Sequence, residues 1–135
     1  MRFIDTNVLL YAFAGDSDAS DRPEKARAVL AEGDIAFSVQ VFQEFFVQAT
    51  HSRRNDPLTH SEAREAIEAL RAFPVQDNTV DIFFQALDIR ARFRISLWDA
   101  NILAAARALG CASVLSEDLN PGQDYGGVTV RNPFR

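Results

Sequence analysis

Short apolar runs alternate along the chain with longer stretches in which apolar residues recur every three or four positions. The short runs predict buried strands, and the longer stretches predict amphipathic helices. Strands are predicted at residues 2–4, 35–37, 75, 112–115 and 128–130. Helices are predicted at residues 7–14, 21–33, 38–49, 59–73, 79–94 and 96–109, with Gly33, Pro74 and Gly110 among the residues that end them.

This alternation of strands and helices favours right-handed crossover connections between parallel strands. A parallel sheet of this kind is covered by helices on both faces. The 135 residues are enough for one hydrophobic core and too few for two. We therefore expect a single domain over residues 1–135, folded as an α/β protein with a three-layer α/β/α sandwich around a mostly parallel central sheet.

The same pattern predicts two details of helix packing. The helix at residues 79–94 contains four large apolar residues at helical spacing, which we expect to face the core: Val80, Phe83, Phe84 and Leu87. Trp98 precedes an acid at the start of the next helix. We expect its indole to pack in the core beside the helix start, with stacking on a nucleic-acid base as the alternative.

Three acidic residues occupy positions at which a parallel sheet opens onto a ligand crevice. Asp5 falls on the turn between the first strand and the first helix, and Asp118 follows the strand at 112–115. Asp99 is the third residue of the helix capped by Ser96, on the face expected to pack on the sheet. Because the carboxyl ends of parallel strands meet at one edge of the sheet, these carboxylates should converge there.

Glu44 is a fourth acid expected at the same edge. It projects from a polar stripe, one helical turn from Gln40 and Gln48, on a helix whose other positions are mainly apolar. None of the four acids has an obvious cationic partner nearby in the sequence. Since four carboxylates in one place repel one another, a bound cation would be needed to keep them all ionised at neutral pH.

Ligands that are all oxygen favour a hard divalent ion, Mg²⁺ or Mn²⁺, over zinc. His51 and His60 lack zinc-site spacing and are expected on the surface, and the single cysteine, Cys111, is expected to be an inert core thiol. Mg²⁺ often binds through one or two carboxylates plus a substrate phosphate. The pattern therefore favours hydrolysis of a phosphoester by a water molecule that the ion activates.

The net charge of −5 argues against a general nucleic-acid binder, because neutralising phosphates needs Lys and Arg. That objection weakens if the four acids bind metal. Some arginines are candidates for contacts with RNA phosphate or a protein partner, although solvated helix ends explain them equally well: Arg53, Arg54, Arg90, Arg92 and Arg94.

No apolar run approaches the roughly 18 residues of a membrane span, and the N-terminus lacks a signal-peptide pattern. We therefore expect a cytoplasmic protein with no membrane contact.

The segments that contain these acids resemble the four acidic motifs of PIN-domain nucleases. They are residues 3–12, Glu44 within its apolar helix, residues 96–100 and residues 115–118. Their order and spacing are similar to those of VapC-type toxins of bacterial type II toxin–antitoxin pairs. The likeness extends over nearly the whole chain, including residues 130–134.

The resemblance implies a PIN-like fold and a Mg²⁺- or Mn²⁺-dependent endoribonuclease that cleaves an RNA substrate. It also implies a homodimer, held inactive by a cognate antitoxin whose C-terminal segment lies over the acidic site.

The resemblance further implies roles for individual residues. Asp5 and Asp99 would be the main metal ligands. Asp118 would be a ligand or would position the water, and Glu44 would be a second-site or outer-shell acid. Hydrogen-bonding support is implied for Asn7 and for Ser116, which stands where many relatives have Thr.

Other interpretations of these residues remain open. Free N–H groups and the helix dipole favour a carboxylate at a helix N-terminus, so Asp5 and Asp99 could each be a cap instead of a ligand. Glu117 lies beside Asp118, and motif position favours Asp118 as the acid that faces the site.

Two other function classes can be weighed against a nuclease. One is a non-catalytic domain that binds RNA or a protein on the same scaffold, although such a domain has no need of four acids. The other is a phosphoryl-transfer receiver or phosphatase, which also places an Asp after its first strand. Asn7 departs from the second Asp of a D-x-D phosphatase pair, and Lys25 lies too early to be a receiver lysine.

Overall fold

A five-stranded sheet forms the centre of the computed structural model, which describes residues 1–15 and 20–135. The strands are β1 (Arg2–Ile4), β2 (Ile35–Ser38), β3 (Val75–Gln76), β4 (Ser113–Leu115) and β5 (Thr129–Arg131). Their order across the sheet is β3-β2-β1-β4-β5, and every neighbouring pair is parallel. The predicted parallel sheet is confirmed.

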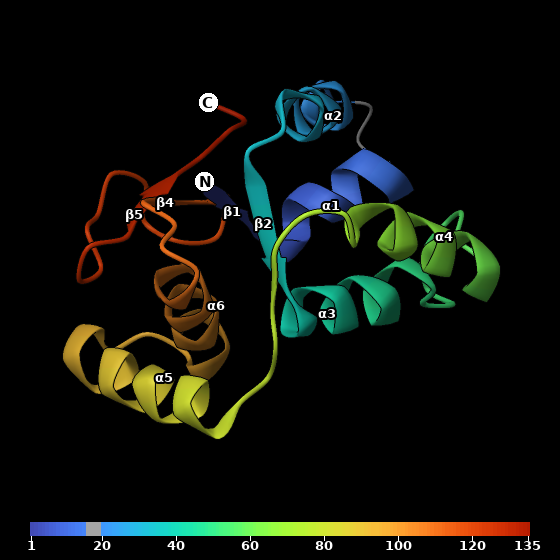
Figure 1. The fold of residues 1–135 in the computed structure, drawn as a ribbon. Helices are drawn as coiled ribbons and strands as arrows, with labels where there is room; N and C mark the ends of the chain where they lie inside the picture. The colour runs from blue at the N-terminus through green and yellow to red at the C-terminus, as the bar shows by residue number, and fades with distance from the viewer. Residues whose placement is uncertain (16–19) are drawn as a thin grey trace.

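Six helices in the described part of the chain connect these strands. They are α1 (Thr6–Ala14), α2 (Arg22–Glu32), α3 (Val39–Ala49), α4 (His60–Leu70), α5 (Val80–Phe93) and α6 (Leu97–Ala108). Figure 1 shows α1, α3 and α4 on one side of the sheet and α5 and α6 on the other. The predicted α/β sandwich is therefore confirmed.

The first strand lies in the middle of the sheet. Residue Arg2 of β1 is in register with Ile35 of β2, and Ile4 is in register with Leu115 of β4. Because all three strands run in the same direction, the chain leaves them at one edge of the sheet. Segments that follow residues 4, 38 and 115 are thereby brought together.

Side-chain caps fix where most of the helices begin. In each case a hydroxyl or carboxylate oxygen accepts a hydrogen bond from a backbone N–H of the first turn, and the capping residues are Asp5, Ser38, Thr59, Thr79 and Ser96. The capping box predicted at Thr59 and Glu62 is present. These caps satisfy N–H groups that a helix start otherwise leaves without partners.

The inner face of α5 differs from the one expected. The buried residues of α5 are Ile82, Ala86 and Ile89, which follow one another at intervals of four and three. The residues expected to be buried are exposed instead. The exposed fraction of the residue is 72% for Val80, 45% for Phe83, 59% for Phe84 and 37% for Leu87. This helix has two apolar stripes, and the one with the small Ala86 packs against α6, which has its own buried alanines.

Other expectations about single residues are confirmed. Cys111 is buried, and His51 and His60 are exposed. Burial raises the pKa of the Cys111 thiol above its ordinary value, which keeps it protonated. No helix in the described residues has both the length and the apolar character needed to cross a membrane.

Candidate active site at the edge of the sheet

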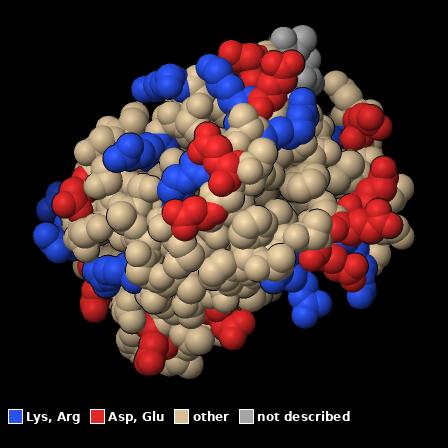
Figure 2. All heavy atoms as spheres, turned by 45° about the horizontal axis from the view of Figure 1, so that its top comes forward, with Lys and Arg blue, Asp and Glu red and all other residues tan. Residues whose placement is uncertain are grey.

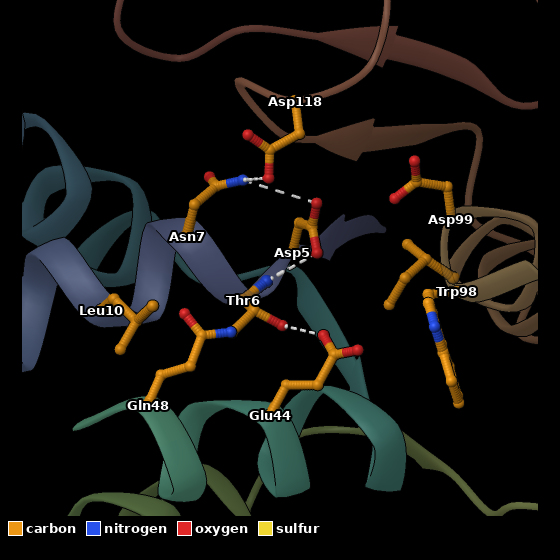
Figure 3. A pocket seen from close by; sticks show the side chains of 10 residues that line it. Asp5, Thr6, Asn7, Leu10, Glu44, Gln48, Trp98, Asp99 and Asp118 are labelled. Carbon is orange, nitrogen blue, oxygen red and sulfur yellow. Dashed lines mark hydrogen bonds between the residues drawn. The ribbon is translucent and has the colours of Figure 1, made fainter. Parts of the chain in front are cut away.

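All four predicted acids line one pocket of about 110 Å³ (Figure 3). Its lining residues are Asp5, Thr6, Asn7, Leu10, Glu44, Gln48, Trp98, Asp99, Ile102 and Asp118. They belong to α1 and its capping residue, to α3, to α6 and to the segment after β4. The fold thus brings together acids that are up to 113 positions apart in the sequence.

Asp5 is buried at the base of the pocket, with 6% of its surface exposed. Its Oδ1 accepts a hydrogen bond of 2.7 Å from the backbone N–H of Thr6, as the cap of α1. Its Oδ2 accepts a second bond of 2.7 Å from the Ser116 hydroxyl. The helix-cap interpretation of Asp5 is therefore correct, but the cap uses only one of its two oxygens.

Burial raises the pKa of the Asp5 carboxyl from its ordinary 3.8 to about 6. Loss of solvation is the largest cause, and the hydrogen bonds from Ser116 and Thr6 oppose it. The negative charges of Asp118 and Glu44 raise the pKa further. The protein therefore keeps this carboxylate in surroundings that disfavour its charge, as expected where a cation compensates for it.

Ser116 and Asn7 connect Asp5 to Asp118. The fully buried Ser116 hydroxyl donates to Asp5 and accepts from the backbone N–H of Asp118 at 3.0 Å. The Nδ2 of Asn7 donates to Asp118 Oδ2 at 3.0 Å and lies 3.5 Å from Asp5 Oδ2. These contacts set the positions of the two carboxylates relative to each other.

Glu117 and Asp118 point in different directions. Glu117 lies outside the pocket, where its Oε1 accepts a 2.6 Å hydrogen bond from the Tyr11 hydroxyl and its Oε2 lies 3.3 Å from Arg22 Nε. Asp118 lines the pocket and faces Asn7 (Figure 3). The question left open by the sequence is answered in favour of Asp118.

Glu44 enters the pocket from α3. Its Oε2 accepts a 2.9 Å hydrogen bond from the Thr6 hydroxyl, and its Oε1 accepts a 3.2 Å bond from Gln40 Nε2. Both donors are uncharged, so they orient the carboxylate without neutralising it. The Glu44 side chain is thus held in place from α1 and from its own helix.

Asp99 faces the same space from the first turn of α6 (Figure 3). Its backbone N–H is capped by the Ser96 hydroxyl at 3.1 Å, which leaves the carboxylate free of the cap. Partial burial, followed by the charges of Asp118 and Glu44, raises the pKa of the Asp99 carboxyl above its ordinary value, against the effect of the Ser96 hydrogen bond.

The expectation that Trp98 packs in the core is wrong. Its side chain is 66% exposed and forms part of the pocket wall. The adjacent Leu97 is half-buried and packs against the core cluster. The helix start therefore uses Leu97 for packing, and the indole faces outward.

The donor set suits a hard divalent cation. The lining contains carboxylate, amide and hydroxyl oxygens, and Asn7 Oδ1 is buried with no hydrogen-bond partner among the described residues. The ion pairs of the described chain involve none of the four acids. In the same residues, no group of three His, Cys, Asp or Glu side chains is arranged to hold an ion directly. An ion that keeps several of its waters, as Mg²⁺ does, fits such an open pocket better than a fully coordinated ion.

None of the five arginines proposed for contacts lines the acidic pocket. Arg53 and Arg54 lie in the loop between α3 and α4, and the other three are at the end of α5. The Arg92 guanidinium stacks over Phe93, 4.8 Å from the ring centre. On the face shown in Figure 2, basic and acidic side chains are interspersed instead of forming one broad basic surface.

Sequence reasoning missed several residues of the pocket. Thr6 sits within the first acidic motif and binds Glu44, so the motif contained the signal. Gln48 lies on the polar stripe of α3, and the sequence gives no sign that it lines the site. Leu10 and Ile102 also line the pocket. In the sequence they look like any other apolar residue on the inner face of a helix, so nothing marks them as part of a site.

Comparisons with solved structures show the same fold in three proteins. A toxin–antitoxin complex from Klebsiella pneumoniae has a chain that is 21% identical, with a TM-score of 0.73 over 99% of this chain and 98% of that chain. VapC20 of Mycobacterium tuberculosis, a toxin that cleaves the sarcin-ricin loop, is 23% identical. Its TM-score is 0.68, and the match covers 87% of this chain and 90% of that chain. The DNA-bound VapBC of Salmonella typhimurium is 17% identical. Its TM-score is 0.70, and the match covers 98% of this chain and 97% of that chain.

A search of curated protein sequences found no match. The family model described as PIN domain, in contrast, matches residues 2–122, which include all four acids of the pocket. PIN domains are a nuclease family whose members typically use divalent metals. The resemblance in the acidic motifs is thereby confirmed, and this chain belongs to the PIN domain family.

Proposed function

We propose that this protein is a Mg²⁺- or Mn²⁺-dependent endoribonuclease that acts in the cytoplasm as the toxin of a toxin–antitoxin pair. One observation supports the proposal most strongly. Asp5, Glu44, Asp99 and Asp118 come from distant segments and line one pocket, and no ion pair among the described residues neutralises them. Such an arrangement is unfavourable by itself and becomes favourable around a cation.

The proposed chemistry is hydrolysis of a phosphodiester bond. When bound, the ion supplies a Lewis acid that activates water at neutral pH and offsets the charge that develops on the phosphate oxygens. Asp5 and Asp99 would hold the ion. Asp118 and Glu44 would orient water or assist a second ion, while Asn7 and Ser116 keep the carboxylates in position through the contacts described above.

Two features support RNA as the substrate. The solved structures with the same fold include a toxin that cleaves an RNA loop, VapC20. The exposed indole of Trp98, next to Asp99, offers an aromatic surface on which an unpaired base can stack.

A direct test is cleavage of total cellular RNA by the purified protein with Mn²⁺ or Mg²⁺ and with EDTA. We expect fragments only when the metal is present. Asp118→Asn should lower the cleavage rate by about 100-fold or more, because the carboxylate that faces the pocket is lost. The neighbouring Glu117→Gln is the matched control and should stay within about twofold of the wild type, since Glu117 binds Tyr11 and Arg22 outside the pocket.

Failure of the wild type to cleave RNA with either ion, while still binding RNA, would support the non-catalytic alternative. Equal loss of activity in the two variants would contradict the assignment of Asp118.

The proposal includes two protein partners. Two of the solved structures with the same fold, from Klebsiella pneumoniae and Salmonella typhimurium, are toxin–antitoxin or VapBC assemblies, which supports a cognate antitoxin for this chain. A second copy of the chain is the other partner. Its proposed binding surface is the exposed apolar face of α5, formed by Val80, Phe83, Phe84 and Leu87, because monomeric proteins rarely expose such a cluster.

We expect Phe84→Glu to weaken the dimer about 100-fold or more, since it places a charge in the centre of the α5 face. Light scattering after size exclusion should then give the mass of a monomer at concentrations where the wild type is dimeric. Val47→Glu is the control, because Val47 is equally exposed, at 62%, on a different helix. A monomeric wild type at high concentration would disprove the dimer.

A further inference from the structure

Gln40 is a buried polar residue of α3. It lies on the polar stripe of α3 with Glu44 and Gln48, yet only 5% of its surface is exposed, whereas Gln48 is open to solvent. Burying an amide is unfavourable unless its donors and acceptor find partners. The contacts of Gln40 therefore indicate why an amide occupies this position.

The Gln40 carboxamide uses both its nitrogen and its oxygen. Its Nε2 donates to Glu44 Oε1 at 3.2 Å and to the backbone carbonyl of Trp98, also at 3.2 Å. Its Oε1 accepts a hydrogen bond from Asn101 Nδ2. The Gln40 side chain is thus connected to one acid of the pocket, Glu44. It is also connected to two residues of α6, one before and one after Asp99.

These contacts join the two helices that face each other across the pocket. Glu44 is on α3, and Trp98 and Asn101 flank Asp99 on α6. The second oxygen of Glu44 is held by Thr6 of α1 at 2.9 Å. Removing Gln40 would leave Glu44 with one hydrogen bond instead of two, and would remove the link from α3 to the turn that contains Asp99.

We propose that Gln40 is a positioning residue of the acidic site. Its carboxamide orients the Glu44 carboxylate and sets the distance between Glu44 and Asp99, so that both can interact with the same bound cation or its waters. This inference rests on the proposed function. An uncharged amide suits the task, because Lys or Arg at this position would also orient Glu44 but would neutralise the charge that attracts the cation.

Mn²⁺ binding without RNA provides a test, with the fluorescence of the only tryptophan, Trp98, as the signal. Trp98 lines the pocket, and Mn²⁺ quenches nearby indoles. Gln40→Met keeps the length of the side chain and removes its hydrogen bonds. We expect its dissociation constant for Mn²⁺ to rise about tenfold or more, in the range found when groups that orient metal ligands are removed. The kcat for RNA cleavage should fall as well, with KM within about twofold of the wild type.

Gln43→Met is the matched control. Gln43 is on the same helix, is exposed, and binds Asn78 outside the acidic pocket. It should bind Mn²⁺ and cleave RNA within about twofold of the wild type. A second variant, Asn101→Ala, removes the donor that holds the Gln40 oxygen, and we expect a weaker effect of about threefold in the same direction.

A purely structural role would lower the melting temperature of Gln40→Met and leave its Mn²⁺ affinity unchanged. That result would overturn the inference without affecting the proposed function, provided that the wild type binds Mn²⁺ and cleaves RNA. If Gln40→Met does not fold, the Mn²⁺ affinity of Asn101→Ala provides the test. An affinity equal to that of the wild type would then overturn the inference. If the wild type binds no Mn²⁺, both the proposed function and this inference are wrong.

Discussion

Asp5→Asn and Asp99→Asn should each lower metal-dependent RNA cleavage by at least about 1,000-fold. Each replacement exchanges a charged oxygen, the proposed metal ligand, for a neutral amide. A loss of about 4 kcal/mol of transition-state stabilisation corresponds to that factor. The geometry supports a large effect for Asp5, which is buried at the base of the pocket and is fixed by Thr6 and Ser116.

Cleavage of RNA by purified variants measures this effect, and growth after induced expression measures it in cells. The wild type should arrest growth when it is expressed without the proposed antitoxin, and neither variant should. Asp56→Asn serves as the control, because Asp56 is an exposed carboxylate in the loop between α3 and α4. Full activity in both site variants would exclude these acids as metal ligands, and harmless expression of an active wild type would argue against a toxin.

The second large effect concerns folding stability in the absence of metal. The folded protein holds the Asp5 proton up to about pH 6, whereas the ordinary pKa is 3.8. The folded state therefore binds more protons between these values, and stability falls as the pH rises through this window. Above pH 6 the loss is complete, at about 3 kcal/mol for a difference of about two pKa units. Asp99 acts in the same direction.

Asp5→Asn removes this titration, so in EDTA at pH 7 the variant should be more stable than the wild type, with the difference shrinking towards pH 4. Urea unfolding of both proteins across this range measures it. Mn²⁺ at about 100 times its dissociation constant should stabilise the wild type at pH 7 by about 2.7 kcal/mol and leave the variant nearly unchanged. A wild type that is more stable than Asp5→Asn at pH 7 in EDTA would show that the buried charge already has a compensating partner.

The positions of the strands and acids could be predicted because they follow from local rules. A short apolar strand before Asp5 and another before Asp118 place both acids at the same edge of any parallel sheet. The cap at Ser96 fixes the start of α6, and helical geometry then turns Asp99 towards that edge. Glu44 follows from the three- and four-residue periodicity of α3.

Features that depend on how elements pack were beyond these rules. The α5 helix has two apolar stripes, and only its contact with α6 decides that Ile82, Ala86 and Ile89 face inward. The burial of Gln40 depends on the position of α6, because Trp98 and Asn101 supply its partners. Four acids were expected to converge closely, yet they line an open pocket in which no three of the described His, Cys, Asp and Glu side chains are arranged to hold an ion directly.

The position of β1 between β2 and β4 has a consequence during protein synthesis. Asp5 leaves the ribosome early, but its partner hydroxyl at Ser116 and the facing Asp118 are added more than a hundred residues later. A nascent chain that is still being translated therefore lacks part of the pocket and cannot pair β1 with β4. The proposed nuclease activity can therefore begin only after β4 has left the ribosome and has paired with β1.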